Sequence, residues 1–218
     1  MCLPLQPPPV NRVYNNFSMK SVTGELKMSY YKYAKEQYEQ PKENLDELWQ
    51  QRLVEWREQG AIEKVDNPTR IPKARELGYK AKNGFSVSRV RIKKGASKRE
   101  RPSGGRRPKR SGQNRFSPKK SKQRIAEERA SDKFSNLTVL NSYWVAEDGT
   151  YKWYEVLMVD PEHPEIEADD DINWVADQKD RAVRGKTPEG RKNRGLKNRG
   201  KGAEKARPSG AANDNKNK

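Results

Sequence analysis

The stretches Leu137-Thr-Val-Leu-Asn-Ser-Tyr-Trp-Val145 and Tyr151-Lys-Trp-Tyr-Glu-Val-Leu-Met-Val159 lie on either side of Asp148-Gly149. Both are rich in the β-branched and aromatic residues that favour strands, and an Asp-Gly pair between two such runs is typical of a hairpin. We therefore predict two antiparallel strands joined by a short turn, and we expect this hairpin to organise the rest of the fold.

Shorter elements are predicted around the hairpin. Period-two alternation over Phe85–Ile92 predicts a third strand, and Pro72–Gly78 predicts a helix that stops at its glycine. Apolar spacing predicts further helices over Ser29–Gln40, from an Asn44 cap to Gly60, over Lys122–Lys133 and over Ile172–Gln178. Together these elements indicate an α+β fold, in which a small antiparallel sheet with a β-hairpin is flanked by helices.

Two of these helices rest on particular side chains. The helix capped by Asn44 would carry on one face Leu45, Leu48, Trp49, Leu53 and Trp56. The acids Asp169–Asp171 would open the helix over Ile172–Gln178, because capping and the helix dipole favour acids at a helix start. The alternative for these acids, a metal cluster, is less favoured because adjacent carboxylates repel each other. His163 lies between Pro161 and Pro164, and we expect it in an exposed turn.

Composition limits the size of the core. The chain has 218 residues, of which 31% belong to the hydrophobic set and 35% are charged, with a mean hydropathy of −1.26. Such a chain cannot bury enough apolar surface to be compact throughout. We predict an N-terminal extension without regular structure over 1–27, a folded core over 28–183 that includes a long basic loop over 93–121, and a basic C-terminal extension over 184–218.

Several classes of protein are excluded because the sequence lacks the groups they need. No apolar run is long enough to span a bilayer, and Met1–Val10 is proline-rich without the apolar core of a secretory signal. Cys2 and His163 are the only residues of their kinds, which leaves no basis for a disulfide, a cysteine zinc site or histidine catalysis. Gly195–Lys201 matches most of a P-loop, but Gly202 stands where Ser or Thr must hold magnesium. We expect a cytoplasmic protein with no enzymatic activity, cofactor, metal site, membrane contact or small-molecule substrate.

The net charge of +17 is unevenly distributed along the chain. From Arg91 to Arg124 there are fifteen Lys or Arg residues and one acid, and from Lys179 to Arg207 there are twelve and three. The segment between them, Glu147 to Asp177, carries eleven acids and one lysine. Basic stretches with so few apolar residues repel themselves in water and become ordered along phosphate. This pattern favours segments that lie along folded RNA and recognise its shape rather than its sequence.

The hairpin aromatics allow two interpretations in this setting. Packing in the core and across the strands is favoured, and a platform on which RNA bases stack is the alternative. The residues concerned are Tyr143, Trp144, Tyr151, Trp153 and Tyr154.

Several motifs together resemble one protein family. They include Lys73-Ala-Arg-Glu-Leu-Gly-Tyr-Lys-Ala-Lys-Asn-Gly84, Arg124-Ile-Ala-Glu-Glu-Arg-Ala130, the first hairpin strand, Val159-Asp-Pro161 and Gly190-Arg-Lys-Asn-Arg-Gly-Leu196. In these residues the chain resembles the fifteen-e family of large-ribosomal-subunit proteins from archaea and eukaryotes, and in Trp56–Glu63 its archaeal branch. The resemblance runs from about Met28 to Arg207, so residues 1–27 have no counterpart in the family.

The resemblance implies a structural constituent of the large ribosomal subunit that binds and stabilises folded rRNA through basic extensions. Its partners would be large-subunit rRNA and neighbouring large-subunit proteins, and a free RNA chaperone or general nucleic-acid binder is the alternative function. The RNA contacts that follow from the resemblance and from the basic stretches are Arg70, Lys73, Arg75, Lys80, Lys82, Arg89, Arg91, Lys93, Lys94, Arg106, Arg107, Lys109, Arg110, Arg115, Lys119, Lys120, Lys122, Arg191, Lys192 and Arg194.

Overall fold

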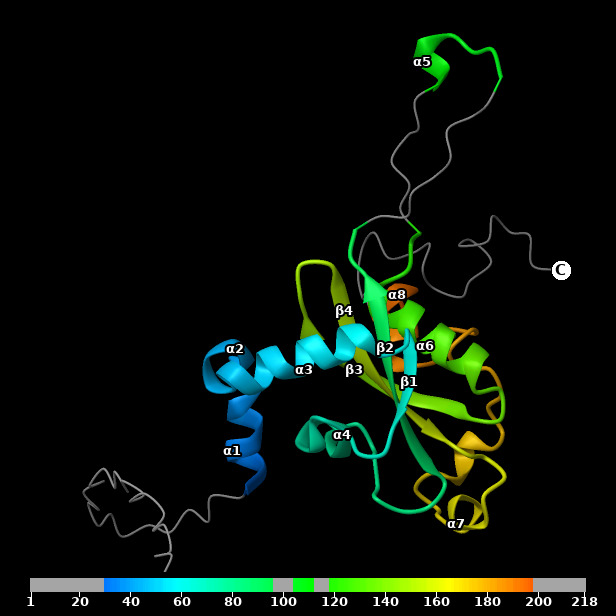
Figure 1. Ribbon diagram of the computed structural model, residues 1–218. Helices are drawn as coiled ribbons and strands as arrows, with labels where there is room; N and C mark the ends of the chain where they lie inside the picture. The colour runs from blue at the N-terminus through cyan, green and yellow to red at the C-terminus, as the bar shows by residue number, and fades with distance from the viewer. Residues whose placement is uncertain (1–29, 96–103, 112–117, 198–218) are drawn as a thin grey trace, which may run out of the picture.

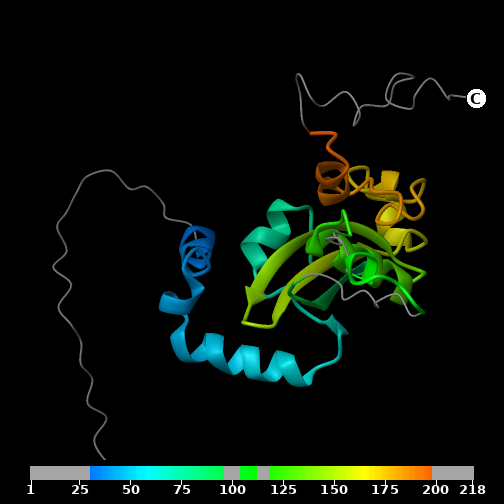
Figure 2. The ribbon, with the colours of Figure 1, turned by 90° about the horizontal axis from the view of Figure 1, so that it is seen from above.

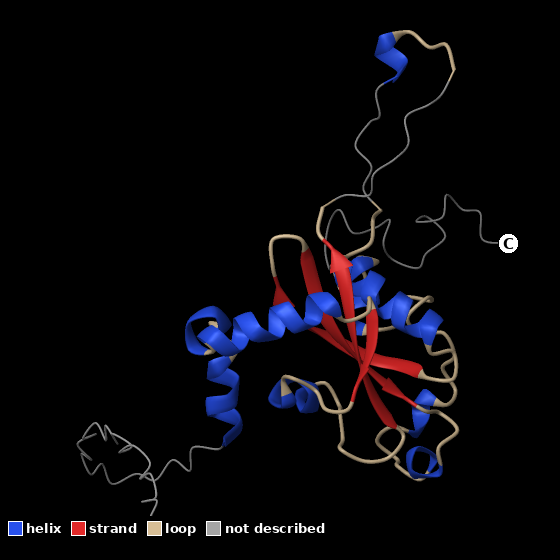
Figure 3. Cartoon of the chain, viewed as in Figure 1, coloured by secondary structure: helices blue, strands red, loops and turns tan. Residues whose placement is uncertain are grey.

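The predicted hairpin forms the centre of the sheet. In the computed structural model, which describes residues 30–95, 104–111 and 118–197, strand β3 (Thr138–Glu147) pairs antiparallel with β4 (Tyr151–Val159). The Asp148 carboxylate closes the turn, because its Oδ1 accepts hydrogen bonds from the backbone N–H groups of Thr150 and Tyr151 at 2.7 and 2.5 Å. The hairpin prediction is therefore confirmed, and the α+β class with it (Figure 1 and Figure 3).

Two further strands complete a four-stranded antiparallel sheet in the order β1-β2-β4-β3. Strand β2 (Phe85–Lys93) pairs with β4 along its whole length and confirms the third predicted strand. Strand β1 (Ile62–Val65) pairs with β2 at the edge and was not predicted from the sequence. With four residues and no buried side chain, it carries too little alternation to be distinguished from a loop.

Side chains alternate across the sheet and build two cores. Helix α6 (Lys122–Lys133) packs Ala126 and Ala130 on one face, against Val156 of β4 and its neighbours. The other face is covered by helix α3 (Asp46–Glu58) and by residues that follow β4, with Trp153 and Leu157 at its centre. The sheet is thus a layer between helices, as the view from above in Figure 2 shows. All five hairpin aromatics are buried or packed against these cores, which confirms the packing interpretation.

The remaining helices are short. They are α1 (Tyr30–Gln37), α2 (Pro41–Asn44), α4 (Ile71–Glu76), α5 (Pro108–Ser111), α7 (Pro164–Glu167), the 3₁₀ helix η1 (Asn173–Val175) and α8 (Pro188–Asn193). Helix α6 has the bounds that the sequence predicted, and α4 ends next to Gly78 as expected. In the described part of the chain, no helix has both the length and the apolarity that crossing a membrane requires.

Two helix predictions need correction. Asn44 does not cap α3, because it is the last residue of α2 and its Nδ2 donates a hydrogen bond to the Glu36 carbonyl at 3.0 Å. Leu48 is 44% exposed rather than part of the buried face, which consists of Trp49, Leu53 and Trp56. The expected helix over Ile172–Gln178 is reduced to the single 3₁₀ turn η1, which no acid caps through its side chain.

Two short helices near the C-terminal side were not predicted. His163 is the N-cap of α7, where its Nδ1 accepts a hydrogen bond from the Glu165 N–H at 3.2 Å. Thr187 is the buried N-cap of α8, and α8 packs on α6 and β3. The stretch that begins at residue 184, predicted as a basic extension beyond the folded core, therefore starts within the folded body.

Gly84 is required where the chain enters β2. Its φ of +84° lies in the left-handed region, and a Cβ at this position would lie 2.5 Å from Cγ1 of Ile166. The close approach brings the turn before β2 against α7, and it places Lys80 and Lys82 beside the segment that follows β4.

Candidate nucleic-acid interface

Cationic side chains from three segments meet at one end of the sheet. These segments are the end of β2, residues 118–122 that lead into α6, and helix α8, which lie together in the upper part of Figure 1. We call this surface the basic pole. Its members are Lys93, Lys119, Lys120, Lys122, Arg191, Lys192 and Arg194.

Polar contacts around Ser121 hold the three segments together. Lys122 Nζ donates to the Gly95 carbonyl at 2.6 Å, which joins the start of α6 to the end of β2. Ser121 Oγ donates to Glu189 Oε1 at 2.7 Å, and Arg124 Nη1 donates to Asn193 Oδ1 at 3.0 Å. Because these contacts join α6 to both ends of α8, the backbone segments that carry the cations are fixed relative to one another.

Four members of the basic pole are exposed and make no side-chain hydrogen bond or ion pair with any other described residue: Lys93, Lys119, Arg191 and Lys192. Lys120 differs, since its Nζ pairs with Glu128 Oε2 at 2.7 Å. An exposed cation without a carboxylate partner keeps its full attraction for a phosphate, and Arg can bind one through two parallel hydrogen bonds. The chemistry of this surface therefore suits a polyanion.

Two cations that are not among the predicted RNA contacts lie next to the basic pole in the chain. Gly185 lies between Arg194 and Arg124, because a Cβ on it would be 2.8 Å from Arg194 Cδ and 3.5 Å from Arg124 Nη2. Arg184 and Lys186 on either side of Gly185 are exposed. The sequence signal for both is the basic stretch from Lys179 to Arg207, to which they belong.

Part of the basic loop, residues 104–111 and 118–121, lies within the described residues. Arg106, Arg107, Lys109 and Arg110 are exposed, and the short α5 that carries the last two lies apart from the sheet in Figure 1. Arg115 lies outside the described residues.

Two of the predicted RNA contacts are held inside the protein. Arg89 is 8% exposed, and its Nη2 contacts Glu155 Oε1 at 3.3 Å and Thr69 Oγ1 at 3.0 Å. Its guanidinium carbon lies 4.1 Å from the centre of the Trp56 ring. Arg70 is half-buried and donates from Nη1 to the Trp144 carbonyl at 3.0 Å, and burial lowers the pKa of its guanidinium.

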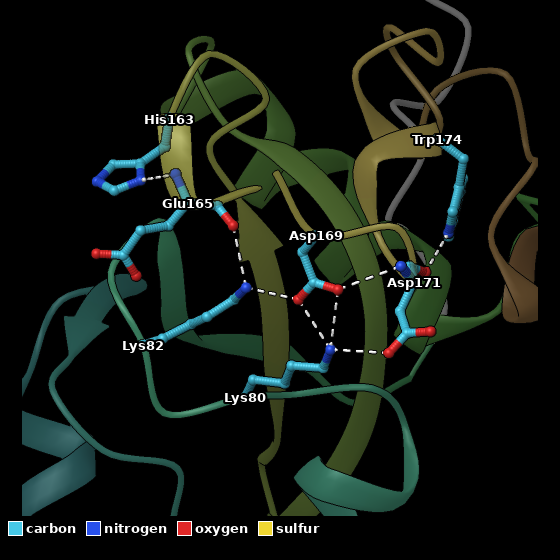
Figure 4. Close-up of polar contacts among 7 residues, drawn as sticks. All are labelled: Lys80, Lys82, His163, Glu165, Asp169, Asp171 and Trp174. Atoms are coloured by element: carbon cyan, nitrogen blue, oxygen red, sulfur yellow. Dashed lines mark hydrogen bonds and ion pairs between the residues drawn. The ribbon is translucent and has the colours of Figure 1, made fainter. Parts of the chain in front are cut away.

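Lys80 and Lys82 meet the acids that were expected to cap a helix (Figure 4). Lys80 Nζ lies 2.8 Å from Asp169 Oδ2 and 3.0 Å from Asp171 Oδ2, and Lys82 Nζ lies 2.5 Å from Asp169 Oδ2. Lys82 also donates to the Glu165 carbonyl at 3.0 Å. Hydrogen bonds from both lysines hold the pKa of Asp169 well below its usual range. The acids thus bind two lysines of the chain itself, and this tertiary contact replaces the expected capping.

The other predicted RNA contacts have protein partners of varied strength. Two of them form ion pairs: Lys73 with Glu76 at 2.8 Å, and Lys94 with Glu147 at 3.2 Å. Two others stack on aromatic rings: the guanidinium carbon of Arg75 lies 5.2 Å from the centre of the Tyr31 ring, and that of Arg91 lies 4.8 Å from the centre of the Tyr151 ring. All four are on or near the surface, where such pairs contribute little to stability and can exchange for phosphate. Within the described ranges no three His, Cys, Asp or Glu side chains gather as a metal site.

Comparison with known proteins confirms the resemblance that the motifs indicated. A family model described as Ribosomal L15 matches residues 29–213. Large ribosomal subunit protein eL15 of Halobacterium salinarum is 55% identical over 193 residues, which cover 87% of this chain and 98% of that protein. The proteins of the same name from Natronomonas pharaonis and Haloarcula marismortui are 53% and 50% identical over the same shares of each chain.

Proposed function

The chain belongs to the Ribosomal L15 family, and from this premise we propose that it holds folded large-subunit rRNA through its basic pole. As a family member of archaeal type it is a structural, non-enzymatic constituent of the large subunit of the cytoplasmic ribosome. Its partners are large-subunit rRNA and ribosomal proteins. Which of its own residues contact RNA is the subject of the proposal.

One observation carries the assignment to the basic pole. Lys93, Lys119, Arg191 and Lys192 come from three segments, are exposed, and have no carboxylate partner among the described residues. Lys80 and Lys82, in contrast, are already neutralised by Asp169 and Asp171. Phosphate binding releases counterions from the RNA most effectively where the protein cation is not already paired, so the basic pole is the favoured contact.

We extend the proposal to the two basic segments that the sequence defines. The loop over 93–121 leaves the basic pole at Lys93 and returns to it at Lys119, and the segment from 184 onward passes through it at α8. Both segments therefore start from the same cationic surface and would extend its contact along the RNA. The buried Arg89 and the half-buried Arg70 support the RNA-binding surface by stabilising the fold.

The proposal is tested with two triple variants of equal charge change. Lys119→Gln, Arg191→Gln and Lys192→Gln remove three cations of the basic pole. Lys35→Gln, Lys42→Gln and Lys64→Gln remove three exposed cations of α1, α2 and β1 and serve as the control. Binding to large-subunit rRNA is measured as a function of salt, and incorporation is followed by sucrose-gradient sedimentation.

We expect the basic-pole variant to lower the log–log salt slope by about 2 to 3, since each phosphate contact contributes roughly 0.7 to 0.9. The control variant should retain the wild-type slope. Equal slopes for the two variants would exclude the basic pole as the principal contact. Wild-type protein spread over all fractions, rather than sedimenting with large subunits, would favour a free RNA chaperone.

A further inference from the structure

A carboxylate is buried beneath the basic pole without an ion-pair partner. Glu127, near the middle of α6, is 0% exposed, and no described Lys or Arg lies within ion-pair distance of it. Its Oε1 accepts a hydrogen bond from Ser142 Oγ of β3, and its Oε2 accepts one from Thr187 Oγ1 at 2.5 Å. A carboxylate in such a place is costly unless its hydrogen bonds are satisfied, so these two hydroxyls are required. Burial raises the pKa of Glu127, and both hydroxyls oppose that rise.

The Thr187 hydroxyl has a second role at the start of α8. It accepts a hydrogen bond from the Gly190 N–H at 3.0 Å and so caps the helix, while its own proton points to Glu127. Gly190 fits tightly in this turn, because a Cβ on it would lie 2.7 Å from the backbone of Gly185. One buried hydroxyl therefore joins the N-terminus of α8 to α6.

Helix α8 needs such an anchor. It has six residues, too few for a helix to be stable on its own. Two other side-chain hydrogen bonds join it to α6 and its N-cap, Ser121–Glu189 and Arg124–Asn193, and both are only partly buried and so accessible to water. The contact between Glu127 and Thr187 is fully buried, and it is therefore the one that solvent does not weaken.

We propose that Glu127 is a positioning residue for RNA binding, which fixes α8 through Thr187 and so holds Arg191 and Lys192 beside Lys119. The inference rests on the proposed function of the basic pole. A cationic surface that is already arranged before binding does not lose side-chain and helix freedom when phosphate arrives, which improves affinity without any added contact. Glu127, although it is an acid, thereby supports the binding of a polyanion, because it fixes the helix that carries the cations.

The first test removes the hydroxyl. Thr187→Ala is compared with Thr187→Ser, which keeps the hydroxyl, and with Thr69→Ala as the matched control. Thr69 Oγ1 also donates to a buried carboxylate, that of Glu155, but on the face of the sheet opposite α6. Rates of amide hydrogen exchange in residues 187–196, the melting temperature and the affinity for large-subunit rRNA are measured on the full chain.

We expect Thr187→Ala to speed exchange in α8 and to weaken RNA binding about tenfold, as expected when two cationic side chains must be ordered on binding. Thr187→Ser should restore both properties. Thr69→Ala should lower the melting temperature and leave RNA affinity unchanged. Unchanged affinity in Thr187→Ala, or an equal loss in both alanine variants, would overturn the inference.

The second test changes the carboxylate itself. Glu127→Met removes the acceptor and leaves the buried hydroxyls of Ser142 and Thr187 without their partner, so the melting temperature should fall, as it should in Thr69→Ala. We expect α8 protection and RNA affinity to fall in Glu127→Met but not in Thr69→Ala, a difference that loss of stability alone does not produce. Glu127→Gln keeps a hydrogen-bonding group at both positions and should bind RNA as the wild type does; a loss of affinity here would count against the inference.

A double-mutant comparison separates this inference from the proposed function. Arg191→Gln with Lys192→Gln is made in the wild-type and in the Thr187→Ala background. If the proposal is correct, the charge changes weaken binding strongly in the wild type and much less once α8 is released. If the charge changes weaken binding equally in both backgrounds, the positioning role of Glu127 and Thr187 is rejected, while α8 remains part of the RNA-binding surface. No effect of the charge changes in the wild-type background would reject α8 as part of the RNA-binding surface.

Discussion

Arg89 shows how a basic residue of this protein can serve the fold. Its charge is balanced by Glu155, which is 0% exposed and which also accepts hydrogen bonds from the Tyr143 hydroxyl and the Thr69 backbone N–H. The stacked Trp56 ring closes the remaining side of the guanidinium. Burial and the neighbouring Glu155 carboxylate raise the pKa of Tyr143, so the tyrosine remains a hydrogen-bond donor. The network joins α3, the loop before α4 and the strands β2, β4 and β3.

Replacement of Arg89 by methionine should therefore destabilise the protein. Glu155 would keep a buried charge without its cation, and breaking such a pair costs about 3–5 kcal/mol. Urea denaturation followed by fluorescence measures the free energy of unfolding. Lys93→Met in the same strand is the control, because Lys93 is exposed and has no partner among described residues, and its change should stay within about 0.5 kcal/mol. A similar small change in both variants would show that the buried pair does not stabilise the fold.

The segment after β4 depends on an ionic contact for its position. It contains only one turn of α7 and one of η1, and it is fixed to the turn before β2 by the contacts of Asp169 with Lys80 and Lys82. The buried Ile166, against which Gly84 packs, provides the apolar part of the same junction. The two segments are thus joined by charge at the surface and by packing beneath it.

The ionic contact gives stability a defined pH dependence. The pKa of Asp169 in the folded protein lies below its value in the unfolded chain, about 3.9, so its contribution is complete above that pH and is lost as the pH falls toward the folded value. We expect the difference in melting temperature between wild type and Asp169→Asn to be constant from about pH 5 to 8 and to shrink in more acidic buffer. Asp170→Asn, an exposed neighbour, is the control and should match the wild type throughout. A constant difference down to pH 2 would exclude the ionic origin.

Elements were predictable from the sequence where a periodic pattern was long enough. The hairpin, β2 and α6 have nine or more residues with clear alternation or capping, and all three were predicted. Strand β1 and helices α7 and α8 have four to six residues, and their formation depends on neighbours that sequence spacing does not reveal. The RNA-binding site is limited in the same way by contacts that the sequence does not reveal. The number of cations predicts a polyanion partner, but it does not tell which cations form ion pairs within the protein. That Lys80 meets Asp169, 89 positions later, follows only from the tertiary fold.

Charge is separated across the molecule as well as along the chain. The basic pole with α8 lies at one end, and α7 lies at the other end of the view in Figure 1. We call the exposed acids near α7 the acidic pole: Glu162, Glu165, Glu167, Asp170 and Asp171. A protein with such a distribution approaches a polyanion in one orientation, because like charges repel at the other end. The separation therefore contributes to where RNA binds as well as to how strongly.

The acidic pole should accordingly limit binding in the wrong orientation. Neutralising Glu162, Glu165 and Glu167 to Gln, together with Asp170→Asn, removes that repulsion while the basic pole stays intact. We expect affinity for unrelated duplex RNA to rise about tenfold at low salt, while affinity for large-subunit rRNA changes much less, so that the ratio of the two falls. Competition binding with labelled rRNA and unlabelled duplex measures this ratio directly. Because screening weakens repulsion between exposed charges, the difference from wild type should disappear at high salt, and an effect that persists there would point to a local structural change at α7.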